Sequence, residues 1–569
     1  KMTQSATIVP NIPLSAWYDE TSADSVEEDI VQLIMESFAP DDRHAFLQPS
    51  LEDIPDPELL KGVTLAVELL LEAVSKNKKI LIVGDYDVDG ITSTVLLTRF
   101  LQKMDYLNFE SFIPNRFIHG YGLTSKSVDE ILLKNPDLVI TVDNGITAKN
   151  EIDRIQTTGA TVIVTDHHLP QDDALPDCVI INPKQQNCSY PFKDLSGVGV
   201  VFVFLIAVRT ALRKQHSWKE GKEPNLLHHL DLVAIGTIAD QVPLLGVNRL
   251  FAKYGLDQMT KRIHQNSSDE FFHYLKVFAE RTHIRFFDSN CIAFRLAPML
   301  NATGRMKDAM AGVGFLMSET EQIAISRYNY IERLNLKRRK KQKTMVKMAV
   351  EKAHSLVEQK QGLLVYDNSF HEGLIGIVAS RLSDQFNQPS IVVSDSEPGV
   401  LKASARTKNE NMMEILQECE MYLERFGGHV NAAGFSIKKD NLEKFHHLYT
   451  DVCTRIMSNH KSDVFKADIE VKLEMLTQKL IDRLKMFEPF GQENKKTIFM
   501  LQGQSLPLPI VMTGKHLKWI LKPDLEMIYW NGAVSADYDS RFNIAFTLSE
   551  NYYRGEKKRQ LIVDAMVPS

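Results

Sequence analysis

Cysteine is scarce in this sequence of 569 residues, which contains only Cys178, Cys188, Cys291, Cys419 and Cys453. Their number is odd and no two of them form a C-x-x-C pair, so the pattern argues against a disulfide framework and against a structural zinc site. Free thiols are typical of a reducing compartment. We therefore expect a cytoplasmic protein.

A long hydrophobic run is also lacking, because the longest, residues 197–208, is too short to cross a bilayer. The N-terminal region has no positively charged stretch of the kind that opens a signal peptide. These absences predict a soluble protein without membrane contact.

Neither sign of charge is in large excess, since 66 Lys and Arg residues stand against 73 Asp and Glu residues, a net charge of -7. Nothing in this total indicates a nucleic-acid-binding protein, so any basic surface must be local. Hydrophobic residues make up 44% and charged residues 24%, which is typical of globular proteins. At about 150 residues per domain, the length predicts three or four domains.

Short apolar runs alternate with helical stretches from residue 80 onward. The runs at 80–83, 138–142 and 161–164 are each followed by polar or acidic residues. Alternation of this kind predicts βαβ units on a largely parallel sheet. Because ligands bind at the carboxyl ends of such strands, the residues after each run are candidates for a site.

The rest of the chain divides by its patterns into further segments. Residues 319–360 contain hardly a helix breaker, and short strand-like runs with turn signals follow residue 463. We expect an N-terminal helical extension (1–75), an α/β domain (76–318), a long connecting helix (319–360), a smaller α/β domain (361–460) and a small β-barrel (461–569).

Three aspartates, Asp85, Asp87 and Asp89, alternate directly after the first apolar run. Like charges this close need a cation or another strong reason, and a bound divalent metal is the simplest. Turns rich in Asp and Gly also occur as plain surface loops, so this motif alone leaves both readings open.

The other strand ends favour the metal. Asp143 follows the second run, Asp166, His167 and His168 follow the third, and Asp240 closes a later apolar segment. Carboxylate and imidazole together suit Mn²⁺ or Mg²⁺ better than a thiolate site would. Such a set matches a two-metal centre that activates a water and stabilises charge on a phosphoryl group. The sequence has no Walker A, H-E-x-x-H or G-x-S-x-G motif.

These motifs, in this order, resemble a known family. GDYDVDG (84–90), TVDNGI (141–146), TDHH (165–168) and GTIAD (236–240) resemble the four signatures of the DHH phosphoesterase superfamily. SAR (404–406) and GGHVNAAG (427–434) resemble the DHH-associated domain. Over residues 50–569 the chain is most similar to the RecJ family of single-stranded-DNA exonucleases, whose C-terminal β-barrel is an OB-fold.

The resemblance implies a metal-dependent exodeoxyribonuclease with two Mn²⁺ or Mg²⁺ ions. It assigns the metal ligands to Asp87, Asp89, Asp143, His167 and Asp240, and the catalytic residues to Asp143, His167, His168 and Asp85. Asp143 would bridge the two ions, and Asp166 could orient an imidazole. The superfamily often has a histidine where this chain has Val83.

The resemblance also implies a phosphate or nucleotide site, formed by Arg305, His371, Ser404, Arg406, Gly428 and His429. Consecutive glycines let main-chain N–H groups approach a phosphate. In the OB-fold, Lys515, Lys518 and Trp519 could supply cations and a stacking ring, although aromatic residues of a β-barrel more often fill its core.

The connecting helix is locally basic. Residues 327–347 include nine basic residues and one acid, among them Arg338, Arg339, Lys340 and Lys341. We expect these four residues to contact a nucleic-acid strand, although a solvated helix face would carry the same charges.

The function we expect is a single-stranded-DNA-specific 5′ to 3′ exonuclease that releases 5′-mononucleotides in DNA repair and recombination. One alternative is a DHH-type phosphodiesterase of short oligoribonucleotides or cyclic dinucleotides. Another is a non-catalytic replication scaffold. Single-stranded DNA, single-strand-binding protein and a recombination helicase are the partners that the resemblance suggests, and a monomer is the default.

Overall fold

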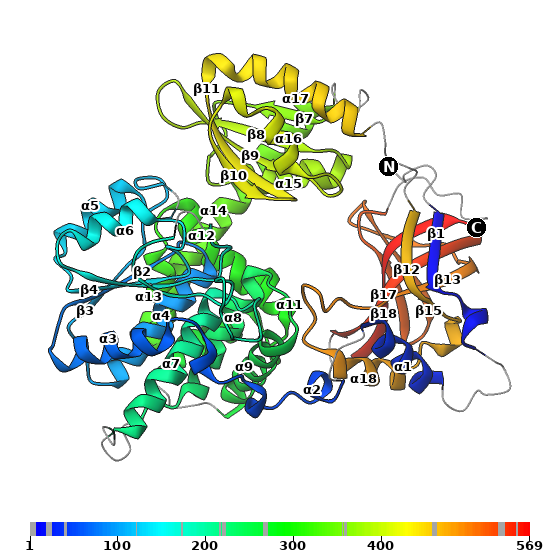
Figure 1. Ribbon diagram of the computed structural model, residues 1–569. Coiled ribbons are helices and arrows are strands. Elements are labelled where there is room, and N and C mark those ends of the chain that lie inside the picture. Colours follow the sequence, from blue (N-terminus) through cyan, green and yellow to red (C-terminus); the bar gives the residue numbers. More distant parts are fainter. Residues whose placement is uncertain are drawn as a thin grey trace.

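The computed structural model describes residues 7–18, 26–38, 43–120, 122–171, 175–215, 218, 223–265, 271–354, 357, 361–457, 464–532, 541–553 and 556–569. This part of the chain forms two α/β domains and a β-rich domain, each built on its own sheet (Figure 1). The first α/β domain and the β-rich domain lie side by side in the view, and the second α/β domain lies above them.

The first domain contains a five-stranded parallel sheet in the order β3-β2-β4-β5-β6. Its strands are β2 (Ile80–Gly84), β3 (Phe109–Phe112), β4 (Leu138–Val142), β5 (Thr161–Thr165) and β6 (Val179–Ile181). Every residue of β2 and β4 is buried, as expected for parallel strands covered on both faces. The parallel sheet predicted from the three apolar runs is therefore confirmed.

Helices cover both faces of this sheet. Ile80 and Ile82 pack among α3 (Val63–Ser75), α4 (Val88–Lys103), α7 (Gly197–Lys214) and α8 (Leu230–Asp240). Leu81 and Val83 point to the opposite face and pack among α5 (Ser125–Leu133) and α6 (Lys149–Gln156). Val83 is thus a core residue on the face that α5 and α6 cover.

A helical layer completes the first domain and leads to the second. It consists of α9 (Gly246–Gln265), α10 (His273–Thr282), α11 (Ser289–Cys291), a π-helical turn (Ile292–Leu296), α12 (Ala297–Met306), α13 (Met310–Leu316) and α14 (Glu321–Ala353). The long helix α14 lies within the predicted 319–360 segment and links the two α/β domains (Figure 1).

The second domain has a mixed sheet in the order β10-β11-β9-β8-β7. Its elements are β7 (Leu363–Tyr366), α15 (Ile375–Phe386), β8 (Ser390–Asp395), β9 (Val400–Arg406), α16 (Met412–Glu418), β10 (Leu423–His429), β11 (Ala432–Lys438) and α17 (Leu442–Met457). Strand β10 is an edge strand, and most of its residues are exposed.

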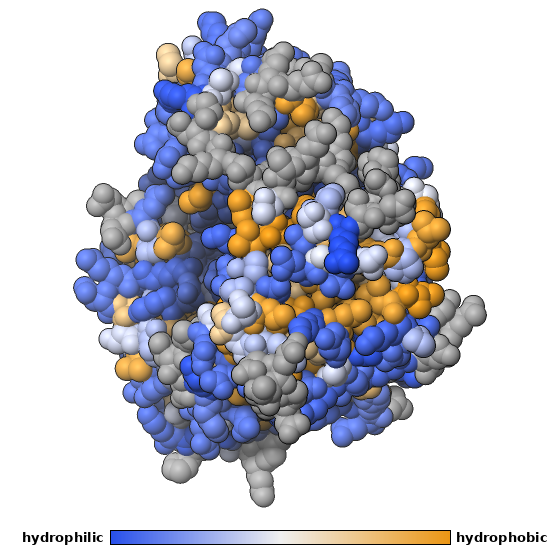
Figure 2. Space-filling view, turned by 90° about the vertical axis from the view of Figure 1, so that its right-hand side faces the viewer, coloured by the Kyte–Doolittle hydropathy of each residue, from blue (hydrophilic) through white to orange (hydrophobic). Residues whose placement is uncertain are grey.

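The third domain is an eight-stranded sheet in the order β1-β12-β13-β17-β18-β16-β15-β14. Its elements are β1 (Thr7–Ile12), β12 (Val464–Glu470), α18 (Gln478–Leu484), β13 (Ile498–Ser505), β14 (Ile510–Met512), β15 (His516–Lys522), β16 (Leu525–Tyr529), β17 (Arg541–Tyr553) and β18 (Glu556–Pro568). Figure 2 shows hydrophobic residues gathered across the face of the molecule that carries this domain. The exposed apolar residues of its outer strands and loops include Leu508, Ile510, Val511 and Ile520.

The described part of residues 1–75 is helical in α1, α2 and α3, as expected for the predicted extension, but it also contains the strand β1. Strand β1 pairs in parallel with β12, and α1 (Val26–Phe38) packs against α18. Phe46, in α2 (Arg43–Leu47), joins the same core. The sequence pattern missed this arrangement because β1 finds its partner strand far along the chain and has no local turn signal. Among the described residues, none of the helices is both long and apolar enough to span a membrane.

Candidate metal centre and substrate site

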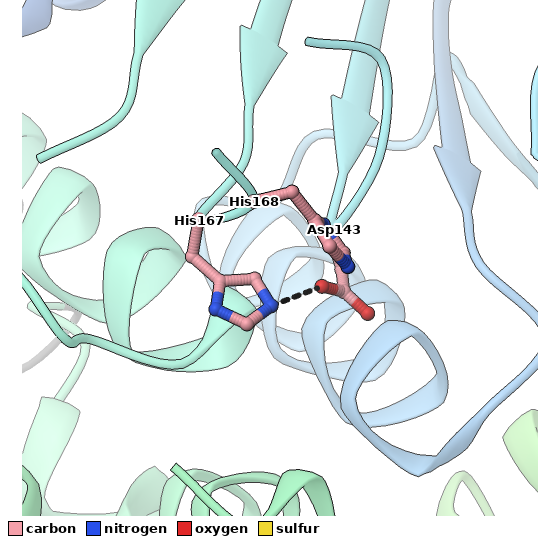
Figure 3. A group of neighbouring side chains, drawn as sticks. All are labelled: Asp143, His167 and His168. Atoms are coloured by element: carbon pink, nitrogen blue, oxygen red, sulfur yellow. Dashed lines mark ion pairs between the residues drawn. The ribbon is translucent and has the colours of Figure 1, made fainter. Parts of the chain in front are cut away.

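The predicted metal ligands meet where strands β2, β4 and β5 end. Side-chain atoms of three overlapping groups lie within 4.8 Å of one another: Asp85, Asp87 and Asp143; Asp89, His167 and Asp240; Asp143, His167 and His168. The parallel strands bring the loops that follow them to one edge, and the C-terminal end of α8 adds Asp240. Figure 3 shows Asp143 and the two histidines converging from neighbouring strands.

His167 lies at the centre of this metal-ligand cluster. Its Nε2 atom is 3.2 Å from Asp143 Oδ1, 3.6 Å from Asp240 Oδ2 and 3.9 Å from Asp89 Oδ2 (Figure 3 draws the first contact). Within the described chain, neither ring nitrogen of His167 nor Oδ1 of Asp143 has a hydrogen-bond partner. Buried polar atoms without partners are unfavourable, and coordination of a cation would satisfy them. The residues therefore fit divalent metal ions.

Helix N-termini hold two of the aspartates. Asp87 caps α4, because its Oδ1 accepts hydrogen bonds from the main-chain N–H groups of Asp89 and Gly90. The carboxylate of Asp89 in turn accepts from the N–H groups of Gly197, at 2.6 Å, and Val198, at 2.8 Å, where α7 begins. These contacts fix the carboxylates before any ligand binds.

Glycines allow α7 and α8 to approach the carboxylates. A Cβ atom at Gly197 would lie 2.6 Å from Asp143 Oδ1, and one at Gly236 would lie 2.9 Å from Asp89 Oδ1. Both distances are too short for a side chain. Gly236 belongs to the GTIAD motif, and its lack of a side chain lets α8 pack against Thr92, Val198 and Asp89.

Asp143 occupies the left-handed region of backbone space, with φ of 61°. Asn144 stabilises this turn: its side-chain amide donates to the carbonyls of Val83, at 3.1 Å, and Val142, at 2.9 Å. Aspartate is one of the residues that adopt this region most readily. Our prediction did not include Asn144, although it stands in the TVDNGI motif.

Asp166 orients His168. Its Oδ1 is 2.7 Å from His168 Nδ1, and its two oxygens also accept from the N–H groups of His167, His168 and Ile146. Burial alone would lower the pKa of His168, but the hydrogen bond and charge of Asp166 outweigh it and raise that pKa to about 9. Burial likewise opposes ionisation of Asp166, but the contacts with His168 lower its pKa to about 2.

The carboxylates of the metal-ligand cluster repel one another in a buried place. Burial, and then the charge of Asp87, raise the pKa of Asp85 to about 7. Burial and neighbouring carboxylates also raise the pKa of Asp87, Asp89 and Asp143. Burial lowers the pKa of His167, which favours the neutral imidazole that binds metals. Cations would relieve this crowding of negative charge.

Four arginines form a second cluster beside the first. They are Arg116 in the loop after β3, Arg305 on α12, Arg338 on α14 and Arg406 on β9. Burial, and then the charge of Arg305, lower the pKa of Arg406. The same two causes lower the pKa of Arg338 to about 10. Burial and the charge of Arg116 lower the pKa of Arg305. Guanidinium groups gathered in this way are suited to bind a phosphate, because their N–H groups match its oxygens.

Close contacts join this arginine cluster to the metal-ligand cluster. A Cβ atom at Gly304, next to Arg305, would lie 2.6 Å from the carbonyl oxygen of Tyr86 in the GDYDVDG loop. The Arg116 guanidinium lies 4.7 Å from the centre of the Tyr86 ring. Our prediction missed Arg116, because no motif of the sequence marks it and only the fold brings it here.

The second domain contributes Arg406 and Ser404, whose Oγ accepts from Arg406 Nη1 at 3.0 Å. Gly376, at the start of α15, leaves room for both, since a Cβ there would lie 3.0 Å from Arg406 Nη2. The predicted neighbours Gly428 and His429 are less closely placed. His429 pairs with Ala432 and Ala432 with Arg406, so His429 lies two strands, or about 10 Å, from Arg406. Gly428 and His429 are both exposed.

His371 lies between the two α/β domains. Its ring makes an edge contact with Phe117 of the first domain, with the centres 5.6 Å apart. A Cβ at the nearby Gly373 would lie 2.5 Å from the carbonyl oxygen of Arg305. This turn therefore packs against the arginine cluster, and His371 itself joins the domains.

A cavity of about 600 Å³ opens next to Asp240, between all three domains. Its lining includes Phe294, Asn301, Arg305, Arg338, Phe490 and Lys496. Phe294 lies in the π-helical turn and is 76% exposed. The cavity thus combines aromatic rings with cations, which are the groups that bind single-stranded nucleic acids.

The remaining predicted contacts lie on α14 and in the third domain. Arg339, Lys340 and Lys341 are exposed on α14. In the third domain Lys515 is exposed, and Lys518 pairs with Glu526 at 2.9 Å.

The stacking role expected for Trp519 is contradicted: Trp519 is 1% exposed and packs in the domain core, the alternative that β-barrels favour. The exposed tryptophan nearby is Trp530, at 51%.

Comparisons with known proteins agree with this geometry. Three family profiles match: "DHH family, N-terminal domain" at residues 79–237, "DHHA1 domain" at 359–455 and "RecJ OB domain" at 467–565. The chain is 32% identical to the single-stranded-DNA-specific exonuclease RecJ of Haemophilus influenzae, over 92% of this chain and 93% of that protein. It is 34% identical to RecJ of Bacillus subtilis, over 92% of this chain and 65% of that protein.

Solved structures of RecJ proteins are also similar to this chain. The crystal structure of RecJ from Thermus thermophilus in complex with Mn²⁺ superposes with a TM-score of 0.81 at 27% identity, covering 99% of this chain and 79% of that one. The same protein has been solved in complex with Mg²⁺. From its sequence similarity over nearly its whole length, its three matched domains and its fold, the chain belongs to the RecJ family of single-stranded-DNA-specific exonucleases.

Proposed function

We propose that this chain is a metal-dependent exonuclease that degrades single-stranded DNA from the 5′ end and releases 5′-mononucleotides. The observation that carries the proposal is the contact between the two clusters, in which Gly304 seats Arg305 against the loop of the metal ligands. An arginine cluster at a fixed distance from a hydrolytic centre suits a terminal phosphate, which carries more charge than an internal one. The 5′ direction follows from the family resemblance.

The proposed roles of the residues follow from their positions. Asp87, Asp89, Asp143, His167 and Asp240 would hold two Mn²⁺ or Mg²⁺ ions, with Asp85 close by. Two such ions activate a water molecule and neutralise the charge that develops on a phosphoryl group. His168, with Nδ1 held by Asp166, presents Nε2 toward the substrate. Arg305, Arg406 and Ser404 would hold phosphate oxygens beside His371, and Gly428 and His429, about 10 Å from Arg406, would reach only a phosphate farther out.

The cavity next to Asp240 would receive the strand. Phe294 and Phe490 offer rings for bases, and Lys496 and Arg338 offer charges for phosphates. Beyond it, Arg339, Lys340 and Lys341 on α14 and Lys515 in the third domain would extend the positive track, whereas the charge of Lys518 is offset by Glu526.

A phosphodiesterase of dinucleotides is the main alternative, and a non-catalytic scaffold is the other. The dinucleotide enzyme has no need of a third domain, whereas here that domain lines the cavity through Phe490 and Lys496. A scaffold tolerates loss of ligand carboxylates, whereas this chain keeps the whole cluster. Both observations favour the exonuclease.

Cleavage of one labelled oligonucleotide tests the proposal. A single-stranded DNA labelled at the 5′ end in one reaction and at the 3′ end in another is incubated with Mn²⁺ or with a chelator. We expect immediate release of the 5′ label as a mononucleotide, a shrinking ladder from the 3′-labelled strand and no reaction without metal. Cleavage of dinucleotides alone would establish the first alternative, and an inert chain the second.

The cellular setting belongs to the same proposal. Family resemblance supports action in DNA repair and recombination, in the cytoplasm, as a monomer that meets single-strand-binding protein and a recombination helicase. Sedimentation of the purified chain would test the monomer. Cleavage rates on strands coated with single-strand-binding protein, compared with bare strands, would test that partner.

A further inference from the structure

Arg249 on α9 is a buried cation that joins three segments of the chain. It is 1% exposed. Its Nε donates a hydrogen bond to the carbonyl oxygen of Phe46 at 3.0 Å. Its Nη1 donates to the carbonyl oxygens of Phe487, at 2.9 Å, and Pro489, at 3.5 Å. Its Nη2 donates to the carbonyl oxygen of Met486 at 3.1 Å. The guanidinium also lies 4.2 Å from the centre of the Phe46 ring. One side chain of the first domain thus binds both α2 and the segment 486–489 of the third.

The partners of this cation are main-chain carbonyls. Burial lowers the pKa of Arg249 to about 10, so the group stays charged at neutral pH. A buried guanidinium is stable only where its N–H groups find acceptors. Because these acceptors come from segments far apart in sequence, the hydrogen bonds and the burial of Arg249 are lost if the segments separate. Arg249 therefore couples the first domain to the third.

Asn494 fixes the same segment from the other side. Its buried side-chain amide donates to the carbonyls of Phe487 and Pro489, both at 2.9 Å, so these two carbonyls serve Arg249 and Asn494 together. The N–H group of Leu244, in the first domain, donates to the carbonyl of Gln492 at 2.8 Å. These contacts explain why the sequence has Asn at position 494.

The segment held in this way is one wall of the cavity. The cavity is lined on this side by Phe490, Gly491, Gln492, Lys495 and Lys496, and elsewhere by residues that include Arg305 and Arg338. We propose that Arg249 is a positioning residue for strand binding: it fixes the wall 490–496 relative to the metal-ligand cluster, so that bases and phosphates beyond the scissile bond are held. The proposal rests on the function proposed above. It predicts that strands long enough to reach the wall depend on Arg249 and that dinucleotides do not.

Steady-state kinetics on two substrates test the proposal. One is a 5′-phosphorylated oligothymidylate of about 20 nucleotides, long enough to fill a single-strand site, and the other is the 5′-phosphorylated dinucleotide. For Arg249→Ala we expect KM for the long strand to rise about tenfold, since a displaced wall no longer offsets the entropy lost when the strand is ordered. We expect kcat, and cleavage of the dinucleotide, to stay within about twofold. Arg249→Lys should restore the KM for the long strand only in part, because an ammonium group cannot donate to all of these carbonyls at once as the guanidinium does.

Lys253→Ala is the matched control. Lys253 lies on the same helix and donates to the carbonyl of Leu47 at 3.0 Å, so it contacts the N-terminal segment but not the wall. We expect its KM to equal that of the parent chain. An equal rise of KM for both substrates, or the same rise in Lys253→Ala, would mean a general loss of stability and would overturn the proposal.

Hydrogen exchange gives a readout that does not need activity. In Arg249→Ala, amide exchange of peptides covering 485–497 should become faster while that of β2 and β4 stays slow. Unchanged exchange in 485–497 would overturn the proposal even if KM rose. If the parent chain cuts neither substrate, the proposed function fails, and the exchange measurement still decides whether Arg249 holds the wall.

Discussion

Asp166 accepts the Nδ1 proton of His168 at 2.7 Å and holds the imidazole with Nε2 turned away from it. The Asp166→Asn variant keeps the shape but removes the charge, so the pKa of His168 should fall from about 9 toward its ordinary value. Loss of such an orienting carboxylate lowers metal affinity or activity by about 10- to 100-fold. We expect a fall in kcat of that size at saturating Mn²⁺, and an NMR titration of His168 should show the lower pKa. Asp153→Asn, an exposed carboxylate on α6, is the control and should change neither.

Asp143→Ala should reduce cleavage to background while the fold stays intact. Asp143 belongs to two of the three ligand groups, so its loss affects the whole metal-ligand cluster. The rate of product formation and the far-ultraviolet circular dichroism spectrum measure the two parts of this prediction. Substantial turnover by the variant would contradict the two-metal arrangement.

The stability of the metal-free chain should fall as pH rises. The pKa of Asp85 is raised from 3.8 to about 7 in the folded state. Between these two pH values Asp85 binds more protons in the folded state than in the unfolded state. Protonation of Asp85 therefore contributes its full stabilisation of the folded state below about pH 4, and this stabilisation is lost as pH rises through about 7. Melting temperatures in a chelator, measured from about pH 4.5 to 8, should show the decline.

The same melting experiment with Mn²⁺ in place of the chelator is its control, because the ion replaces the protons. At 100 times its Kd, a bound ion adds about 2.7 kcal/mol of stability. The rise in Tm on adding Mn²⁺ should therefore be larger near pH 8 than near pH 5.5, and Asp143→Ala should lose most of it. An equal rise at both pH values would speak against metal binding by the titrating carboxylates.

Arg406→Ala should weaken recognition of a terminal phosphate. A hydrogen bond to a charged group contributes about 1.5–3 kcal/mol, so KM for a 5′-phosphorylated strand should rise about 10- to 100-fold. The effect on a 5′-hydroxyl strand should be much smaller. Arg425→Ala, an exposed arginine on β10 of the same sheet, serves as the control. Equal losses on both strands would assign Arg406 to internal phosphates instead.

Neutral substitution of Arg339, Lys340 and Lys341 should weaken binding of long strands and flatten its salt dependence. Each phosphate contact contributes about 0.7 to the slope of log K against log salt for a single strand. Removal of three contacts should reduce the slope by about 2. Fluorescence anisotropy between roughly 50 and 300 mM salt measures it. An unchanged slope would leave these side chains as solvated residues of α14.

The sequence was sufficient to predict that the carboxylates and histidines of the metal-ligand cluster meet at one edge of the sheet, whereas their roles as metal ligands came from the family resemblance. The residues of the first three motifs lie in the loop, or in the first helical turn, that follows a buried strand, and parallel strands deliver their carboxyl ends to one edge. The same reasoning located Asp85, Asp143 and His167 without any contact information. The glycines of the motifs, such as Gly236, are explained only by the close approach that the fold creates.

Long-range contacts set the limit of that prediction. Arg116 has no motif of its own and reaches Tyr86 only through the fold. Trp519 and its neighbours alternate along β15, so the sequence left open which side faces the core; the structure buries Trp519 and exposes Ile520. The pairing of β1 with β12 joins residues so far apart that no local pattern could reveal it.

That pairing also has a consequence for biosynthesis. Strand β1 leaves the ribosome roughly 450 residues before β12, a wait of about 20–90 s at ordinary rates of translation. During this time the first α/β domain can fold, but β1, α1 and Phe46 lack their core. A ribosome stalled before residue 464 should therefore hold a folded catalytic domain behind an N-terminal segment open to proteases or chaperones.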